Sequence, residues 1–237
     1  MTVPDSAAIN SAVAALGEFF ALPAADSDSW LPIHTLWEDA ATVREYARRA
    51  QSAIAASMGV ELADVPVRAA ASSVHLSIAA RLLSPVVGAA TCLGAVPLLT
   101  ARTVFWQPTS THRPGLGTAG AACVTAAGVR QCAGAIADSL IREVLRPLNE
   151  AMRVATALSP QVLWGNVASA VNGAVTVLSQ SRPQHEAHGR ALVSALIATE
   201  PLRDAAEILD SGFRRRNCCL FYQVPGSGYC GDCVLVQ

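Results

Sequence analysis

The sequence has few charged residues and few aromatic ones. Charged side chains make up 15% of its 237 residues, aromatic side chains make up 5%, and the formal net charge is −1. Because no strong positive field would hold a polyanion along the surface, we expect no nucleic-acid partner. Hydrophobic residues make up 52% of the chain, which excludes a disordered polymer and indicates a globular protein with a sizeable core.

Signals for export and for membrane insertion are also weak. Residues 1–5 contain no basic cluster, and no signal-peptide core follows them. One uncharged stretch, residues 82–101, is long enough to cross a bilayer, but it contains two prolines, two glycines and several hydroxyl residues. A bent, buried core helix explains it better. We therefore expect a cytoplasmic protein without a transmembrane span, which approaches a membrane at most peripherally.

Helical spacing of apolar residues dominates the rest of the chain and predicts a mainly α fold. The expected helices are 37–58, ended by Gly59; 66–83 and 86–99, separated near Pro85; a long helix through Val129 and Leu148, kinked at Pro147; one opened by Ser159 and Pro160; and 184–209, broken at Pro201. Residues 102–106 are β-branched and aromatic and predict a short strand, and 107–120 predict a loop. We expect a helical body, residues 1–212, and a small cysteine-rich hairpin or loop lobe, residues 213–237.

Four of the seven cysteines lie close together near the C-terminus: Cys218, Cys219, Cys230 and Cys233. In a cytosolic protein such a group indicates metal binding rather than disulfides, and an odd total further disfavours a complete disulfide framework. Neighbouring side chains of an extended chain point to opposite sides, so two adjacent thiols do not easily grip one tetrahedral ion. The spacing therefore favours an iron–sulfur cluster, with zinc as the alternative. The other cysteines, Cys92, Cys123 and Cys132, are expected to be small apolar core residues.

The segment RRRNCCLFYQVPGSGYCGDC, residues 214–233, resembles the C-terminal signature of the FhuF-type ferric-siderophore reductases. That family carries a [2Fe–2S] cluster on a Cys-Cys-x10-Cys-x2-Cys pattern, which the four clustered cysteines match position for position. Residues 75–85 and 163–166 are also similar to the helical body of the family. The resemblance implies a [2Fe–2S] cofactor held by Cys218, Cys219, Cys230 and Cys233, with no catalytic residue beyond the cluster.

The function that the resemblance implies is a one-electron reduction of siderophore-bound Fe(III) to Fe(II), which releases iron in the cytosol. The partners would be a ferric siderophore and an external electron donor. Two alternatives stay open: a zinc-stabilised binding module, and a [2Fe–2S] electron carrier or iron sensor without siderophore turnover. Four thiolates, two sulfides and two ferric ions carry a charge of about −2. We therefore expect Arg214, Arg215 and Arg216 either to stabilise the reduced cluster and attract an anionic chelate, or simply to form a solvated basic end to a helix.

Other motifs carry less weight. Residues 115–120 fit G-x-G-x-x-G, but a proline-containing loop precedes them instead of a strand, so we expect no dinucleotide site there. His185 and His188 share a helical face and are expected to be exposed polar residues rather than metal ligands. Several residues are candidates for lining a chelate pocket but are equally well explained by packing or capping: His75, Arg81, Trp106, His112, Arg113 and Trp164.

Overall fold

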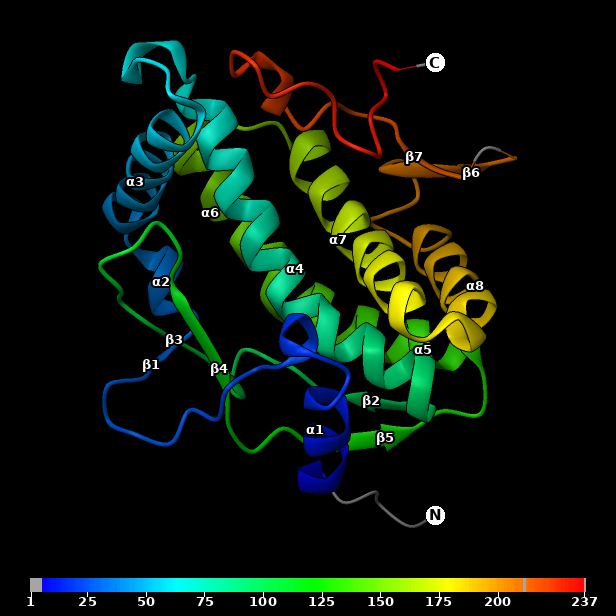
Figure 1. Ribbon diagram of the computed structural model, residues 1–237. Helices are drawn as coiled ribbons and strands as arrows, with labels where there is room; N and C mark the ends of the chain where they lie inside the picture. Colours follow the sequence, from blue (N-terminus) through cyan, green and yellow to red (C-terminus); the bar gives the residue numbers. More distant parts are fainter. Residues whose placement is uncertain (1–5, 211, 237) are drawn as a thin grey trace.

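Two long helices form the centre of the protein. The computed structural model describes residues 6–210 and 212–236, and in it α4 (Val67–Leu93) and α7 (Pro160–Ser181) lie side by side (Figure 1). Helix α3 packs against α4, and α8 packs against α7 on the opposite side. The α-helices around the central pair are α1 (Ser6–Ala14), α2 (Thr35–Glu38), α3 (Ala40–Met58), α5 (Val129–Ile136), α6 (Arg146–Thr156) and α8 (Glu186–Ile197). The expected mainly α class is confirmed.

Both central helices are covered by neighbours on nearly all sides. By length and composition alone each could cross a membrane, but 67% of the most apolar window of α4 and 72% of that of α7 are buried inside the protein. A helix that is apolar all round and covered by other helices is a core helix. This burial supports the expected buried helix in place of a membrane span.

Helix α4 corrects one prediction. Residues 66–83 and 86–99 do not form two helices, because α4 runs through Pro85 without ending. A proline inside a helix removes one backbone hydrogen bond and strains the turn before it. Here Pro85 and its neighbours are fully covered by the core, and tertiary packing outweighs the local cost. The helix ends at Gly94, which has the left-handed conformation, and Ala95–Pro97 forms strand β2.

Short antiparallel strands lie at the end of the helices where α4 terminates (Figure 1). Strands β1 (Leu31–Pro32), β3 (Val104–Gln107) and β4 (Gly115–Thr118) form one sheet, and β2 pairs with β5 (Cys123–Thr125). Strand β3 overlaps the strand predicted at 102–106. The prediction that 107–120 are all loop is wrong, because Gly115–Thr118 pairs with β3. An added Cβ at Gly117 would lie 2.9 Å from the Trp30 ring, so glycine allows this close approach.

The segment from Val129 to Thr156 is helical but changes geometry in its middle. Ala137–Leu145 forms a π-helix between α5 and α6, and the N–H of Arg146 bonds to the carbonyl of Ile141. The irregularity thus precedes Pro147, the residue at which a kink was predicted. Helix α7 begins as predicted, because the Ser159 hydroxyl accepts a hydrogen bond from the N–H of Val162.

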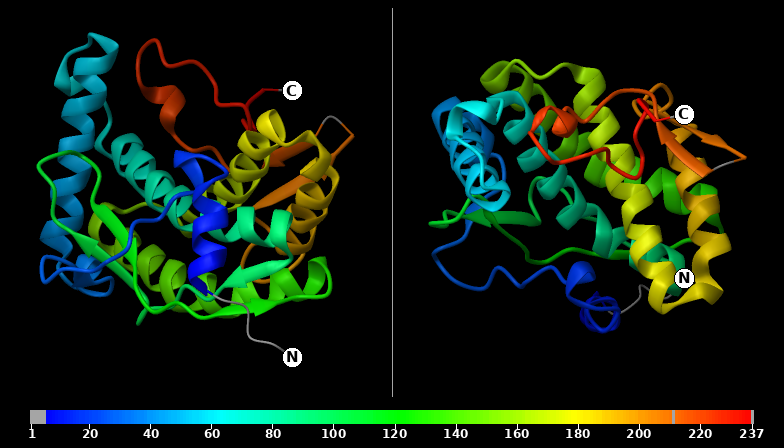
Figure 2. Two further views of the ribbon diagram at one scale, coloured as in Figure 1. Left: turned by 60° about the horizontal axis from the view of Figure 1, so that its bottom comes forward. Right: turned by 45° about the horizontal axis from the view of Figure 1, so that its top comes forward.

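The last helix is shorter than predicted. Helix α8 ends at Ile197, and the expected continuation to residue 209 is replaced by a hairpin of β6 (Ala206–Leu209) and β7 (Gly212–Arg215). Pro201 lies between helix and hairpin, where its ring cannot continue a helix. The division into 1–212 and 213–237 stays a prediction. The hairpin leads into the C-terminal lobe, residues 217–236, which lies across one end of α4 and α7 (Figure 2).

Candidate metal centre

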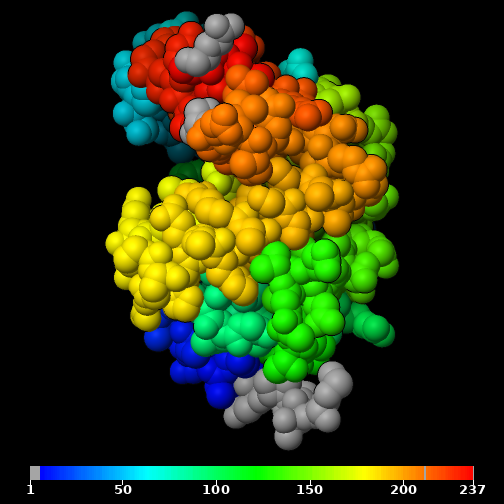
Figure 3. Space-filling model, turned by 90° about the vertical axis from the view of Figure 1, so that its right-hand side faces the viewer, coloured from blue at the N-terminus to red at the C-terminus, as the bar shows by residue number. Residues whose placement is uncertain are grey.

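The C-terminal lobe is attached to the helical body by an apolar contact. Val224 has no exposed surface and packs with Ala55, Val65 and Ala69, with Leu220 partly buried beside them. Full burial of one such side chain contributes about 1.5–3 kcal/mol. Figure 3 shows the lobe beside the residues that precede α4. The lobe therefore has a fixed seat on α3 and α4.

A second, polar contact attaches the lobe to α7. Asp232, between the last two clustered cysteines, accepts a hydrogen bond from Asn172 Nδ2 at 3.1 Å. The N–H of Arg215 donates to the carbonyl of Asp232 at 3.1 Å. Burial raises the pKa of Asp232, while the Ser169 hydroxyl, Arg215 and Asn172 oppose this rise. Asp232 was not among the residues predicted from the sequence, although its place between two clustered cysteines was a usable signal.

The four cysteines share one local backbone pattern. The N–H of Leu220 points at Cys218 Sγ at 3.3 Å, and the N–H of Leu235 points at Cys233 Sγ at 3.4 Å. The backbone groups of Phe221 and Asp232 make the same kind of hydrogen bond to Cys219 and Cys230. Each sulfur is therefore supported by the N–H two residues further along the chain. Such hydrogen bonds to cluster sulfurs are one means by which a protein sets the potential of an iron–sulfur site.

The sulfur atoms of Cys219 and Cys230 lie 3.8 Å apart. Two ligands of one tetrahedral metal, each bonded at about 2.3 Å, stand about 3.8 Å apart. The hydrogen bond between the two side chains lowers the pKa of Cys219 to about 6, against the effect of burial. The same bond raises the pKa of Cys230. These two side chains, one from each cysteine pair, thus lie at the separation that two ligands of one metal ion require.

The donor set suits a two-iron cluster better than a single ion. Within residues 6–210 and 212–236, no three His, Cys, Asp or Glu side chains converge on a point that could hold one metal ion. A [2Fe–2S] cluster needs only two cysteine sulfurs for each iron. Cys219 and Cys230 meet this requirement for one iron. Cys218 and Cys233 flank them in the sequence and are turned by the same backbone pattern.

The three arginines before the cysteines separate in space. Side chains alternate along a strand, so Arg214 and Arg216 share one face of the chain. Arg214 pairs with Glu207 at 2.7 Å, and Arg216 lies 3.5 Å from Glu207 and 3.9 Å from Asp204. Arg215 points the other way and is only 1% exposed. The structure thus brings Arg215 alone to the cysteines, and the role of the other two in binding a chelate stays a prediction.

Arg215 is held beneath the cysteines by backbone carbonyls. Its Nε donates to the carbonyl of Asn217 at 3.0 Å, and its Nη2 donates to that of Val162 at 3.2 Å. A Cβ added to Gly165 would lie 2.7 Å from Nη2, so the absence of a side chain there makes room for the guanidinium. Burial lowers the pKa of Arg215, and the nearby thiols and carboxyl group oppose this. An arginine stays charged in proteins, so a positive charge lies under an anionic site.

A hollow of about 230 Å³ opens beside the two paired sulfurs. It is lined by Ser72, Ser73, Leu76, Cys219, Phe221 and Cys230. Cys230 is the exposed member of the four cysteines, whereas Cys219 and Cys233 are buried. A second reactant can therefore approach the site from the side of Cys230.

The other candidate pocket residues do not gather in one place. Arg81 donates to the carbonyl of Pro114, and Trp106 donates to Thr35 near the three-stranded sheet. The exposed Arg113 donates to its half-buried neighbour His112. His75 is fully buried between α4, α6 and α7, and Trp164 lines a cavity between α6 and α7.

The minor cysteine and histidine predictions agree with the structure. Cys123 and Cys132 are buried and Cys92 is half-buried, and burial raises the pKa of each thiol. His188 is exposed and His185 is half-exposed.

Residues 215–235 match the family model of the FhuF 2Fe-2S C-terminal domain. This span contains all four clustered cysteines together with Arg215 and Asp232. No curated protein matches the chain.

Proposed function

Because its C-terminal segment is a FhuF-type [2Fe–2S] domain, we propose that this protein reduces ferric siderophores in the cytoplasm. A [2Fe–2S] cluster, when bound, supplies electrons one at a time. One electron converts ferric iron to ferrous iron, which hard oxygen donors hold far more weakly. The products are ferrous iron and the free chelator, and the electron comes from an external donor.

The cysteines and Arg215 have different roles in this reaction. Cys218, Cys219, Cys230 and Cys233 hold the cofactor, and their sulfurs receive the backbone N–H groups described above. The buried charge of Arg215 offsets part of the negative charge of four thiolates and two sulfides. The extra negative charge of the reduced state is offset in the same way, so Arg215 favours electron uptake.

The observation that carries the proposal is the open side of the cysteine group. The hollow beside Cys219 and Cys230 lets a chelate approach the sulfurs, with Leu76 and Phe221 as apolar walls. Arg214 on β7 and Arg216 just after it are half-exposed. An anionic chelate that reaches the lobe would compete with Glu207 for these two guanidinium groups.

The test is a direct measurement of iron release. Chemically reduced protein is mixed without oxygen with a ferric siderophore, and ferrous iron is trapped with a ferrous-specific chromogenic chelator. We expect close to one ferrous ion per stored electron. Cys230→Ser should lose bound iron, and Cys92→Ser should keep it. Protein that keeps its electron in the presence of hydroxamate, catecholate and carboxylate chelates alike would refute the proposal.

A second candidate function is electron transfer to another protein or iron sensing. Tyr222 and Tyr229 are exposed at 43% and 62%, and their rings stack with centroids 6.4 Å apart beside Cys230. Exposed tyrosines are common in protein interfaces, so this pair favours a protein partner close to the site. Oxidation of the reduced protein by a partner protein, together with no ferrous iron from any chelate, would support this alternative. A colourless protein containing zinc and no sulfide would instead support a zinc-stabilised module.

A further inference from the structure

A buried line of polar side chains crosses the helical core. Asn166 Nδ2 donates to both the carbonyl and the hydroxyl of Ser72 at 3.0 Å and lies 3.3 Å from His75 Nδ1. On the other side of the ring, His75 Nε2 lies 2.6 Å from Asn149 Oδ1. The four residues come from α4, α7 and α6, and none is more than 5% exposed.

The direction of every hydrogen bond in this line follows from one carbonyl group. The carbonyl of Ser72 can only accept, so Asn166 must present its NH₂ group to it. This NH₂ group has two hydrogens for three nearby acceptors, so one hydrogen is shared between two of them. Because an amide nitrogen does not accept hydrogen bonds, His75 Nδ1 is the acceptor of its contact with Asn166, and Nε2 carries the proton. His75 then donates to Asn149 Oδ1, and the NH₂ group of Asn149 must point away from the ring.

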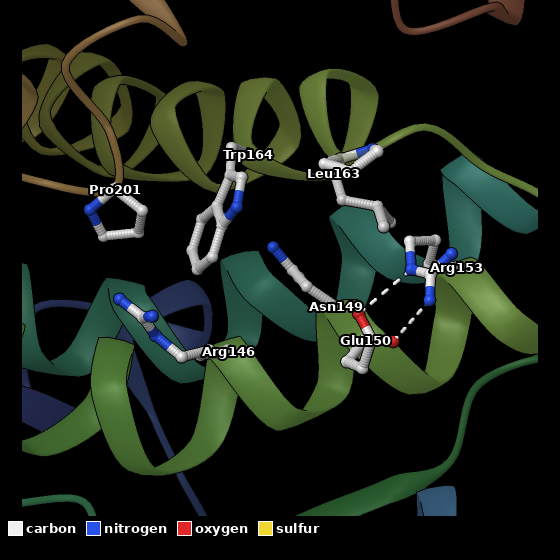
Figure 4. A pocket seen from close by; sticks show the side chains of 8 residues that line it. Arg146, Asn149, Glu150, Arg153, Leu163, Trp164 and Pro201 are labelled. Atoms are coloured by element: carbon white, nitrogen blue, oxygen red, sulfur yellow. Dashed lines mark hydrogen bonds and ion pairs between the residues drawn. The ribbon is translucent and has the colours of Figure 1, made fainter.

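This NH₂ group has no acceptor among the described residues. Asn149 Nδ2 is buried and unpaired, and a buried donor without a partner is costly, which calls for an acceptor that the chain itself does not supply. Asn149 lines a cavity of about 380 Å³ between α6, α7 and the loop that contains Pro201 (Figure 4). That volume lies within the range of small-molecule sites.

The charges around the cavity favour an anion. Arg146, Asn149, Glu150 and Arg153 share one face of α6 at helical spacing. Glu150 is paired with Arg153 through two hydrogen bonds of 3.0 and 2.6 Å, so these two charges compensate each other. The side chain of Arg146 is exposed and makes no hydrogen bond or ion pair within the described part of the chain. One positive charge and one buried N–H donor are therefore left for a ligand.

The walls of the cavity are apolar and aromatic. Figure 4 shows Trp164 above Asn149 at the middle of the cavity, with Arg146 below Pro201 at one end and Arg153 at the other. An indole face and a proline ring suit the flat apolar part of a small molecule. A guanidinium group binds a carboxylate through two parallel hydrogen bonds.

We propose that this cavity binds a small organic carboxylate with a flat apolar body. The carboxylate lies between Arg146 and Asn149 Nδ2, and the apolar body packs against Trp164 and Pro201. The site is separate from the hollow beside the cysteines, and the proposal does not rest on siderophore reduction.

Isothermal titration calorimetry of the cluster-loaded full chain tests the proposal, with 1-naphthoate as the probe. We expect 1-naphthoate to bind at least tenfold more tightly than the neutral 1-naphthalenemethanol and more tightly than 1-naphthyl phosphate. Arg146→Gln should weaken 1-naphthoate binding at least tenfold. Arg142→Gln, one turn earlier and paired with Asp138 outside the cavity, should leave it within twofold of the unmodified protein.

A second variant tests the buried donor. Asn149→Asp keeps the shape of the side chain and replaces the NH₂ group by an oxygen that repels a carboxylate, so binding should fall at least tenfold while the melting temperature is checked for folding. If Asn149→Asp does not fold, the exposed Arg146→Gln variant still decides. No binding of 1-naphthoate at millimolar concentration, equal binding of the neutral probe, tighter binding of the phosphate, or an Arg146→Gln variant that binds normally would each overturn the proposal.

Discussion

Replacing Gly165 by alanine should move the arginine that lies under the cysteines. The added Cβ would stand 2.7 Å from Arg215 Nη2, 3.2 Å from Nε and 3.3 Å from Cζ. Real Cβ contacts are essentially never as short as the first of these distances. The guanidinium must therefore shift away from the carbonyls of Val162 and Asn217, to which it donates.

The two opposing contributions to stability can be estimated separately. A helix-interior glycine replaced by alanine ordinarily gains about 0.5–1 kcal/mol. Loss of one hydrogen bond from a charged donor costs about 1.5–3 kcal/mol. We therefore expect Gly165→Ala to lower the free energy of unfolding by about 1–2 kcal/mol. Displacement of the charge should also lower the one-electron potential, by about 59 mV for each 1.4 kcal/mol of lost stabilisation.

Gly173→Ala is the matched control. It lies on the same helix, and its added Cβ would meet no atom within 4 Å. Urea unfolding of the cluster-loaded protein and an anaerobic redox titration measure the two effects. Equal unfolding free energies and equal midpoint potentials for the two alanine variants would refute the assigned role of Arg215.

Three further predictions concern the core and the attachment of the lobe. Burial lowers the pKa of His75 to about 4, so the His75 ring binds a proton more tightly in the unfolded chain than in the folded one. The free energy of unfolding should therefore fall as the pH drops below 6.5, by roughly 2 kcal/mol at pH 5. Urea unfolding at several pH values should show this dependence of the unfolding free energy on pH in His188→Gln but not in His75→Gln. Asp232→Ala should speed loss of iron to a chelator, whereas Asp204→Ala, at an exposed position, should not; equal rates would contradict the proposed attachment. Val224→Ala should cost about 2 kcal/mol of unfolding free energy, and a cost under 0.5 kcal/mol would mean that the lobe is not seated on α3 and α4.

The group of four cysteines and the kind of cofactor could be predicted from the sequence because the signal is local. Sixteen residues hold four thiols at a characteristic spacing, and no tertiary contact is needed to recognise them. The separation of Arg215 from Arg214 and Arg216 was also accessible in principle, since side chains alternate along a strand. It was missed because residues 184–209 were predicted as helix, which left the hairpin before the cysteines unrecognised.

Other features depend on contacts distant in the sequence. Helix α4 continues through Pro85 only because neighbouring elements cover it on all sides. The line from Ser72 to Asn149 joins three helices, and no local pattern marks its members. Asp232 acquires its role from Asn172, sixty residues earlier in the chain. Local propensity carries no information about such partners.

The attachment of the C-terminal lobe to the helical body has a consequence for biosynthesis. Val224 needs a surface built from α3 and α4, and Asp232 needs α7, so both attachment points belong to segments that leave the ribosome before the cysteines do. The surfaces to which the lobe attaches are therefore made before the clustered thiols are. Iron and sulfide would then be delivered to a nearly finished molecule, and a failure of their supply would leave a folded chain with an empty lobe instead of an unfolded one.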